Sequence, residues 1–199
     1  MVQTCRKPVE STGEKTVTAV KHQRAPEIRN LSNEEIFSRC VRRFNQTEGD
    51  WNAFADAQIE GHRRAQHRFI GGGGSGKHDD PDVVQAGHFT LSVMLMPPGQ
   101  GASEHTHEVE EVLFVLQGEL TVTIQDEQGR TSARALSRWD CISCPAGVPH
   151  GFWNRGTGDV YVQVMIGKAR PGPVGYTDER IYADEVERTR QLAGARAAG

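Results

Sequence analysis

The sequence has few cysteines and no long apolar run, and these absences exclude several classes of protein. The chain contains 4 Cys in 199 residues, which is too few for a scaffold held together by disulfides. No stretch approaches the roughly 18 consecutive apolar residues that a membrane span needs. The first ten residues, MVQTCRKPVE, lack the apolar segment of a secretory signal. We therefore expect a cytoplasmic protein with reduced thiols and no membrane partner.

Excess basic charge is also missing. The formal net charge is −3, so a nucleic-acid partner is not expected. Hydrophobic residues make up 36% and aromatic residues 7% of the chain, which is less than in an average globular protein. Part of the length is therefore expected to be loop or tail. The remainder is enough for one domain with a real core.

The N-terminal part of the chain contains one clear helix signal. Residues 1–28 have no hydrophobic periodicity and predict a flexible arm. Ser32 and Glu35 then fit a capping box, and apolar residues follow at spacings of three and four. This pattern predicts a helix over 32–45. A second short helix over 50–66 is possible, and residues 29–85 together predict a helical and loop extension that packs on the domain behind it.

From residue 88 onward the apolar pattern changes to a period of two. Strand-like runs cover 88–96, 111–117, 119–125, 131–137, 140–144 and 159–166, and turn residues separate several of them. Many short strands at this spacing predict an all-β antiparallel sandwich or barrel over 86–170. Which face of 88–96 lines the interior stays open. Residues 171–199 predict a tail with a short helix near 184–193.

Three side chains with metal-binding chemistry follow each other at even spacings. His105, His107 and Glu111 are two and four residues apart, so in an extended chain all three leave the same face. Two imidazoles and a carboxylate on one face suit iron, manganese, nickel or zinc. About forty residues further on, the turn of Pro145–Gly147 can present His150 to the same interior.

These two segments resemble the paired motifs of the cupin superfamily. The fixed positions of the motifs are matched by Gly99, His105, His107, Glu111 and Gly118, and by Pro145, Gly147, His150 and Asn154. Trp139 stands where the second motif opens with glycine. The resemblance covers about 86–168. It implies a cupin-type antiparallel β-barrel, or jelly roll, in which His105, His107, Glu111 and His150 hold one divalent transition metal. It also implies a homodimer.

The cupin fold carries many activities, so function has to come from the site. Four protein ligands would leave an octahedral ion two open positions for a small-molecule substrate and O₂. Our first interpretation is an oxidoreductase, an Fe(II)-type dioxygenase that acts on a small aromatic or dicarbonyl/carboxylate compound. One alternative is a non-oxidative isomerase, lyase or hydrolase that uses Mn, Ni or Zn. The other is a non-catalytic binding or sensor protein.

Several further residues are candidates for the site. Arg64 belongs to a cationic cluster over 62–68, which is either a solvated face or a segment across the barrel mouth that offers a guanidinium to a carboxylate. Glu104 is next to the first ligand and could act as a base. Strand parity and position add the following candidate pocket residues: His67, Leu113, Val115, Phe152 and Asn154.

Two other motifs receive structural interpretations. The glycine run of 71–77 resembles the start of a phosphate-binding loop, but His78 follows in place of Ser or Thr. We expect a flexible loop or lid there and no nucleotide site. Cys141 and Cys144 form a CxxC on a predicted strand, where residues three apart face opposite sides. They are expected to be core-filling thiols and not a redox pair.

Overall fold

The computed structural model describes residues 22–197, and these residues divide into two compact units at the boundary between Ser38 and Arg39. Most of the predicted arm, residues 1–21, lies outside the described residues. Helix α1 (Asn33–Cys40) begins as the capping box predicts: Glu35 N donates to Ser32 Oγ at 3.2 Å, and Ser32 N donates to Glu35 Oε2 at 2.7 Å. The helix ends before the predicted residue 45, and a separate 3-10 turn follows at 44–46.

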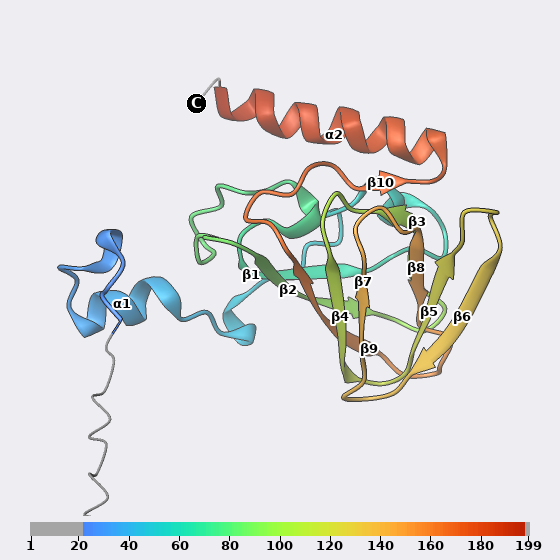
Figure 1. The fold of residues 1–199 in the computed structure, drawn as a ribbon, viewed down its shortest axis with the longest axis horizontal. Coiled ribbons are helices and arrows are strands. Elements are labelled where there is room, and N and C mark those ends of the chain that lie inside the picture. The colour runs from blue at the N-terminus through green and yellow to red at the C-terminus, as the bar shows by residue number, and fades with distance from the viewer. Residues whose placement is uncertain (1–21, 198–199) are drawn as a thin grey trace, which may run out of the picture. The chain divides into compact units, whose positions relative to one another are not determined.

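Two antiparallel five-stranded sheets form the body of the second unit (Figure 1). One sheet has the order β1 (Ala65–Ile70), β2 (Thr90–Met96), β9 (Val160–Ile166), β4 (Glu111–Gln117) and β7 (Cys141–Cys144). The other has the order β10 (Gly175–Tyr176), β3 (Gly101–Thr106), β8 (His150–Trp153), β5 (Leu120–Gln125) and β6 (Thr131–Leu136). The prediction of an all-β antiparallel fold is confirmed, and each strand predicted from alternation is present.

The hydrophobic core lies between the two sheets. Strand β9 illustrates how the core is built: buried and partly exposed residues alternate along its whole length. Val162 of β9 and Leu113 of β4 are fully buried, as are Leu120 of β5 and Phe152 of β8. Apolar side chains from both sheets therefore fill one interior, as in any sandwich whose strands alternate between core and solvent.

Strand β2 turns its more polar face inward. Thr90, Ser92, Met94 and Met96 are buried, while Phe89, just before the strand, is 39% exposed. The sequence left this choice open. Strand β2 pairs with β1, and Ser92 Oγ lies 3.4 Å from the amide nitrogen of Gln66 on that neighbouring strand. The buried Ser92 side chain therefore has a polar neighbour inside.

Two predictions outside the barrel need correction. The possible helix over 50–66 is wrong: the segment contains only the short 3-10 helix η3 (Ala55–Gln58), and β1 begins at Ala65 and pairs with β2. The helix predicted for 184–193 is longer: α2 spans Glu179–Ala197 (Figure 1). It packs against η3 and β10. Among the described residues, no helix is both long and apolar enough to cross a membrane.

The glycine run is a buried turn and does not lie exposed as a lid. Residues 71–75 are buried, and Gly73–Ser75 form the 3-10 helix η4. Ser75 Oγ donates to the carbonyl oxygen of Gly72 at 2.6 Å. Lys77 Nζ forms an ion pair with Asp50 at 2.5 Å. This lysine therefore has a structural partner in the protein, which agrees with the expectation of no nucleotide site.

Trp139, which stands where the cupin motif has glycine, has a left-handed backbone conformation that favours glycine. Its φ of 77° makes it the single non-glycine residue with positive φ among the described residues. The cysteine pair that follows on β7 faces opposite sides, as predicted, and both thiols are free. Cys144 is buried, but Cys141 is exposed, so the expectation of two core-filling thiols is wrong for Cys141.

Candidate metal centre

Four side chains from both sheets converge inside the barrel. His105 comes from β3 and His150 from β8, which pair in register, while Glu111 opens β4 and His107 lies in the loop between β3 and β4. All four are buried, and their ligand atoms lie within 4.8 Å of one another. The distances from Nε2 to the nearest Glu111 oxygen are 3.7 Å for His105, 3.4 Å for His107 and 2.8 Å for His150.

Backbone carbonyls fix the orientation of two of the imidazoles. Nδ1 of His105 lies 2.7 Å from the carbonyl oxygen of Ser103, and Nδ1 of His150 lies 2.8 Å from that of Val148. A carbonyl only accepts, so each Nδ1 carries a proton, and Nε2, which points to the centre of the group, is the atom that a metal would bind in place of a proton. The donor set and its supporting contacts therefore fit a divalent transition metal.

The charges of the group fit the same role. Burial alone would raise the pKa of Glu111, but the charge of His107 and hydrogen bonds from the three histidines outweigh it and hold that pKa well below its usual value. Burial lowers the pKa of His105. Burial also opposes the charged form of His150, but the hydrogen bond to Glu111, the charge of Glu111 and the contact with Val148 together outweigh burial and raise the pKa of His150. A cation competes with that proton for the same lone pair, so metal uptake releases protons.

A small and mostly apolar cavity is lined by three of the four candidate ligands, His105, His107 and Glu111. Its volume is about 10 Å³, which is space for about one water molecule. The apolar and aromatic side chains on its wall include Phe54, Met94, Phe152, Val164, Ile166 and Tyr176. A ligand of several atoms therefore displaces side chains when it enters, and unbranched Met94 is the wall residue that moves most easily.

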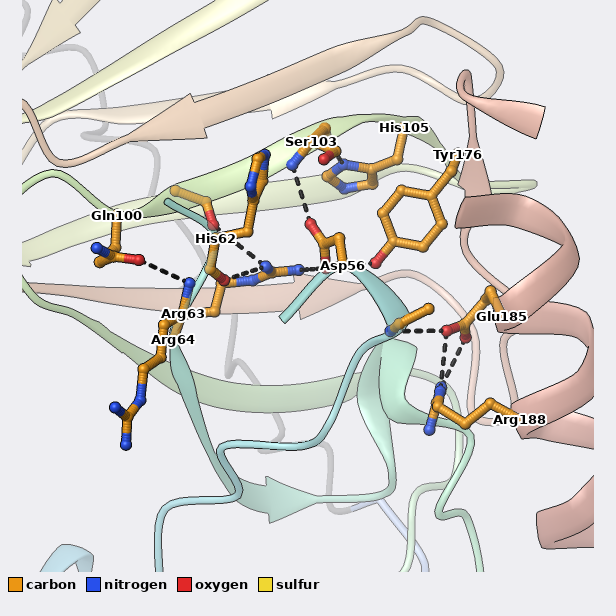
Figure 2. Close-up of polar contacts among 12 residues, drawn as sticks. Asp56, His62, Arg63, Arg64, Gln100, Ser103, His105, Tyr176, Glu185 and Arg188 are labelled. Carbon is orange, nitrogen blue, oxygen red and sulfur yellow. Dashed lines mark hydrogen bonds and ion pairs between the residues drawn. The ribbon is translucent and has the colours of Figure 1, made fainter. Parts of the chain in front are cut away.

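Arg64 reaches this cavity but is already paired. Its side chain is 2% exposed, and Nη2 lies 2.8 Å from Oδ1 of Asp56. Nη1 donates to the carbonyl oxygens of His62 and Gly101 at 3.0 and 3.1 Å. Figure 2 shows Tyr176, whose hydroxyl donates to the same Asp56 oxygen at 2.8 Å. The guanidinium is therefore not free at the barrel mouth as the sequence suggested: both terminal nitrogens are used within the protein, and only Nε has no partner among the described residues.

The other candidate residues are distributed differently. Phe152 lines the cavity, while Leu113 and Val115 are buried in the core without lining it. His67 lies outside the cavity, where Nδ1 contacts the carbonyl oxygen of Thr47 at 3.0 Å and its ring packs against that of Phe44 at a tilt of 36°.

Two polar candidates also lie away from the cavity. The carboxylate of Glu104 contacts Thr131 Oγ1 at 3.4 Å instead of the ligand group, which removes the basis for its role as a base. Asn154 donates from Nδ2 to the carbonyl oxygens of Met96 and Gly158 at 2.9 and 2.8 Å. It therefore holds a turn and does not face the cavity.

Sequence reasoning missed two polar residues that line the cavity, Gln66 and Tyr176, and a third, Asp56, that contacts the lining residues Arg64 and Tyr176. Asp56, Gln66 and Tyr176 are all buried. Gln66 had a usable signal, since it is two residues from Arg64 and shares its face on an extended chain. Asp56 and Tyr176 had none, because they meet only through the fold, 120 residues apart.

Comparison with known proteins agrees with this geometry. Residues 92–167 match the family model described as a cupin domain. A 49-residue segment is 39% identical to acireductone dioxygenase from Candida albicans strain WO-1, and strain SC5314 gives the same values. That match covers 25% of this chain and 28% of the relative, so it extends over little more than a quarter of the relative's length.

Solved structures share the fold at low sequence identity. An oxalate oxidase structure aligns with a TM-score of 0.52 and 16% identity, and the alignment covers 84% of this chain and 75% of that one. The polyketide cyclase RemF from Streptomyces resistomycificus aligns with a TM-score of 0.52 and 22% identity over 71% of this chain and 90% of that one. A mutant of Bacillus subtilis oxalate decarboxylase aligns with a TM-score of 0.51 and 17% identity over 68% of this chain and 31% of that one.

Proposed function

Because this chain is a cupin superfamily protein whose barrel brings four metal-binding side chains together, we propose that it is an Fe(II)-dependent dioxygenase acting on a small carboxylate or dicarbonyl compound. The observation that carries the proposal is the complete and buried group of His105, His107, Glu111 and His150 beside an apolar cavity. When bound, iron would supply Lewis acidity and redox chemistry there.

The residues around the group contribute orientation and exclusion of water. Hydrogen bonds to Ser103 and Val148 hold two of the imidazoles. The apolar walls limit access of water, which strengthens every electrostatic contact within the cavity. The small volume favours a carboxylate or dicarbonyl compound over the aromatic compounds that the sequence also allowed.

The dioxygenase part of the proposal is supported by the segment similar to acireductone dioxygenase. In a dioxygenase reaction one O₂ is consumed per substrate and both of its atoms enter the products. The substrate supplies all the electrons, so no separate reductant is needed. Manganese, nickel or zinc at the same ligands would instead support the non-oxidative alternatives, which need no O₂.

The test is O₂ uptake by protein loaded anaerobically with Fe(II), measured against a panel of small hydroxy acids, oxo acids and diketones. We expect uptake that depends on both iron and substrate, with both atoms of ¹⁸O₂ found in the products. His105→Ala should abolish it. His88→Ala is the matched control, because His88 is exposed and belongs to no ligand group.

Two results would contradict the proposal. Product formed equally well without O₂ would identify a non-oxidative isomerase, lyase or hydrolase. Ligand binding with no product across the panel would identify a binding or sensor protein.

We extend the proposal to a homodimer. A shallow depression on the outer surface is lined by apolar side chains that include Phe44, Phe69, Val93, Leu116 and Tyr161. Apolar depressions of this kind commonly mark interaction sites. Sedimentation velocity tests this part, and a monomer at micromolar concentration would contradict it.

A further inference from the structure

Two buried polar atoms beside the metal centre have no hydrogen-bond partner among the described residues. They are Nε of Arg64 and Oε1 of Gln66. Both side chains line the cavity, and they are 2% and 1% exposed. Leaving a buried donor and a buried acceptor unpaired costs stability, and native proteins rarely do so without a reason.

The rest of each side chain is fixed by other contacts. Both terminal nitrogens of Arg64 are used, one by Asp56 and the other by two carbonyls. The amide nitrogen of Gln66 is directed to Ser92 Oγ at 3.4 Å. The atoms left without a partner are one N–H donor and one carbonyl acceptor, on two cavity-lining residues that are two apart and share a face of the extended chain at the start of β1.

The charges around the cavity indicate the charge of the ligand. Asp56 balances Arg64, and Glu111 is the one carboxylate among the four metal ligands. A divalent ion at that group would leave one net positive charge next to the cavity. A monoanion neutralises it, whereas a dianion would leave excess negative charge in an apolar interior, which is costly.

We propose that the cavity recognises a small α-hydroxy carboxylate and that Gln66 is a specificity-determining residue. The carboxylate accepts a hydrogen bond from Arg64 Nε, and the hydroxyl group donates one to Gln66 Oε1. This inference rests on the proposed function, because the ligand needs a loaded metal centre. The inference adds the chemical class of the ligand and the two atoms that bind it, Arg64 Nε and Gln66 Oε1.

The first experiment compares the binding of three probes to the zinc-loaded full-length protein by titration calorimetry. Glycolate carries the carboxylate and the hydroxyl, acetate lacks the hydroxyl, and oxalate is a dianion without a hydroxyl donor. We expect glycolate to bind about tenfold more tightly than acetate, as one good buried hydrogen bond would give. A wild-type preference for oxalate or for acetate would overturn the inference.

The second experiment uses Gln66→Met, which keeps the length of the side chain and removes the amide. The ratio of glycolate to acetate affinity should fall about tenfold, toward one. The melting temperature without ligand should rise, because an unpaired buried carbonyl has been removed. If Gln66 only supported the fold, the same variant would melt earlier, so the two roles give opposite results.

Ser92→Ala is the matched control. It removes the contact of the Gln66 amide nitrogen but leaves the carbonyl in place, so the affinity ratio should stay at the wild-type value. Zinc content is measured in parallel for each protein. Zinc uptake with an unchanged ratio in Gln66→Met would overturn this inference alone, whereas a wild-type protein that takes up no metal would overturn the proposed function with it.

Discussion

Asp56 and Arg64 form an ion pair of 2.8 Å in which neither side chain is more than 2% exposed. The pair links η3 to the residue before β1. Through the second oxygen of Asp56, which accepts the backbone N–H of Ser103 at 3.0 Å, it also holds β3 two residues before the first metal ligand. One carboxylate therefore connects the segment outside the matched family region to the strand that carries His105 (Figure 2).

Replacing Asp56 with Asn should strongly destabilise the protein. The substitution leaves the Arg64 cation buried without a counter-charge, which typically costs about 3–5 kcal/mol. Urea unfolding measures the loss. Glu187→Gln is the control, because it breaks an exposed pair with Arg190 on α2 and should change stability far less. Equal effects of the two substitutions would mean that burial of the Asp56 pair contributes nothing.

The contribution of Asp56 should also depend on pH. Burial alone would raise the pKa of this carboxyl. The charge of Arg64 and the hydrogen bonds from Arg64, Ser103 and Tyr176 outweigh burial and hold the pKa below the ordinary value of 3.8. A depressed folded-state pKa gives stability that is fully present above pH 3.8 and is lost as the pH falls through the folded-state pKa. The difference in unfolding free energy between wild type and Asp56→Asn should therefore shrink below that pH. A constant difference would argue against a charged Asp56.

Removing a metal ligand should lower metal content. His107→Ala takes away one of the four donors. Loss of a residue that only hydrogen-bonds to a metal ligand already lowers metal affinity about tenfold, so loss of a ligand itself should lower it by at least as much. Elemental analysis after dialysis against a weak chelator measures it. Replacing the exposed His88 by Ala should leave metal content unchanged. Full occupancy in His107→Ala would mean that the metal lies elsewhere.

The two cysteines of β7 should differ in reactivity. Burial, with the nearby charge of Glu111, raises the pKa of the Cys144 thiol to about 12, and only the thiolate reacts readily. Cys141 is exposed on the other side of the strand. Brief treatment of the native protein with iodoacetamide at about pH 8 should modify Cys141 and spare Cys144. Mass spectrometry of the peptide 139–155 assigns the sites, and modification in urea should reach both.

Trp139→Gly should stabilise the protein. Trp139 has a φ of 77° and is 60% exposed, so it bears the strain of a left-handed conformation and buries little in return. Relief of that strain is worth about 1 kcal/mol. Gly129→Ala is the reciprocal test, because Gly129 has a φ of 76° with open space around it. Gly129→Ala should destabilise the protein by about the same amount. If Trp139→Gly instead lowers stability, the contact between Trp139 and Phe114 contributes more than the strain costs.

The ligand group could be predicted because its signal is local. Even spacing placed His105, His107 and Glu111 on one face, and a proline–glycine turn supplied His150. Strand β1 could not be found in this way, because its inward side includes buried Gln66, so no apolar alternation marks it. The pairing of Asp56 with Tyr176 depends on residues 120 positions apart, and no local pattern reports such a contact. Alternation likewise divided β2 into two faces without showing that its threonine, serine and methionines face inward.

The side chains of the proposed metal centre and those proposed to recognise the ligand come from different parts of this chain. The four metal-binding residues lie within 92–167, whereas Arg64 and Gln66 lie before this region. A barrel of this kind can therefore acquire a new preference by changes in its flanking segments while its chemistry stays the same. For protein engineering, exchange of the flanks between related barrels is a direct route to altered selectivity.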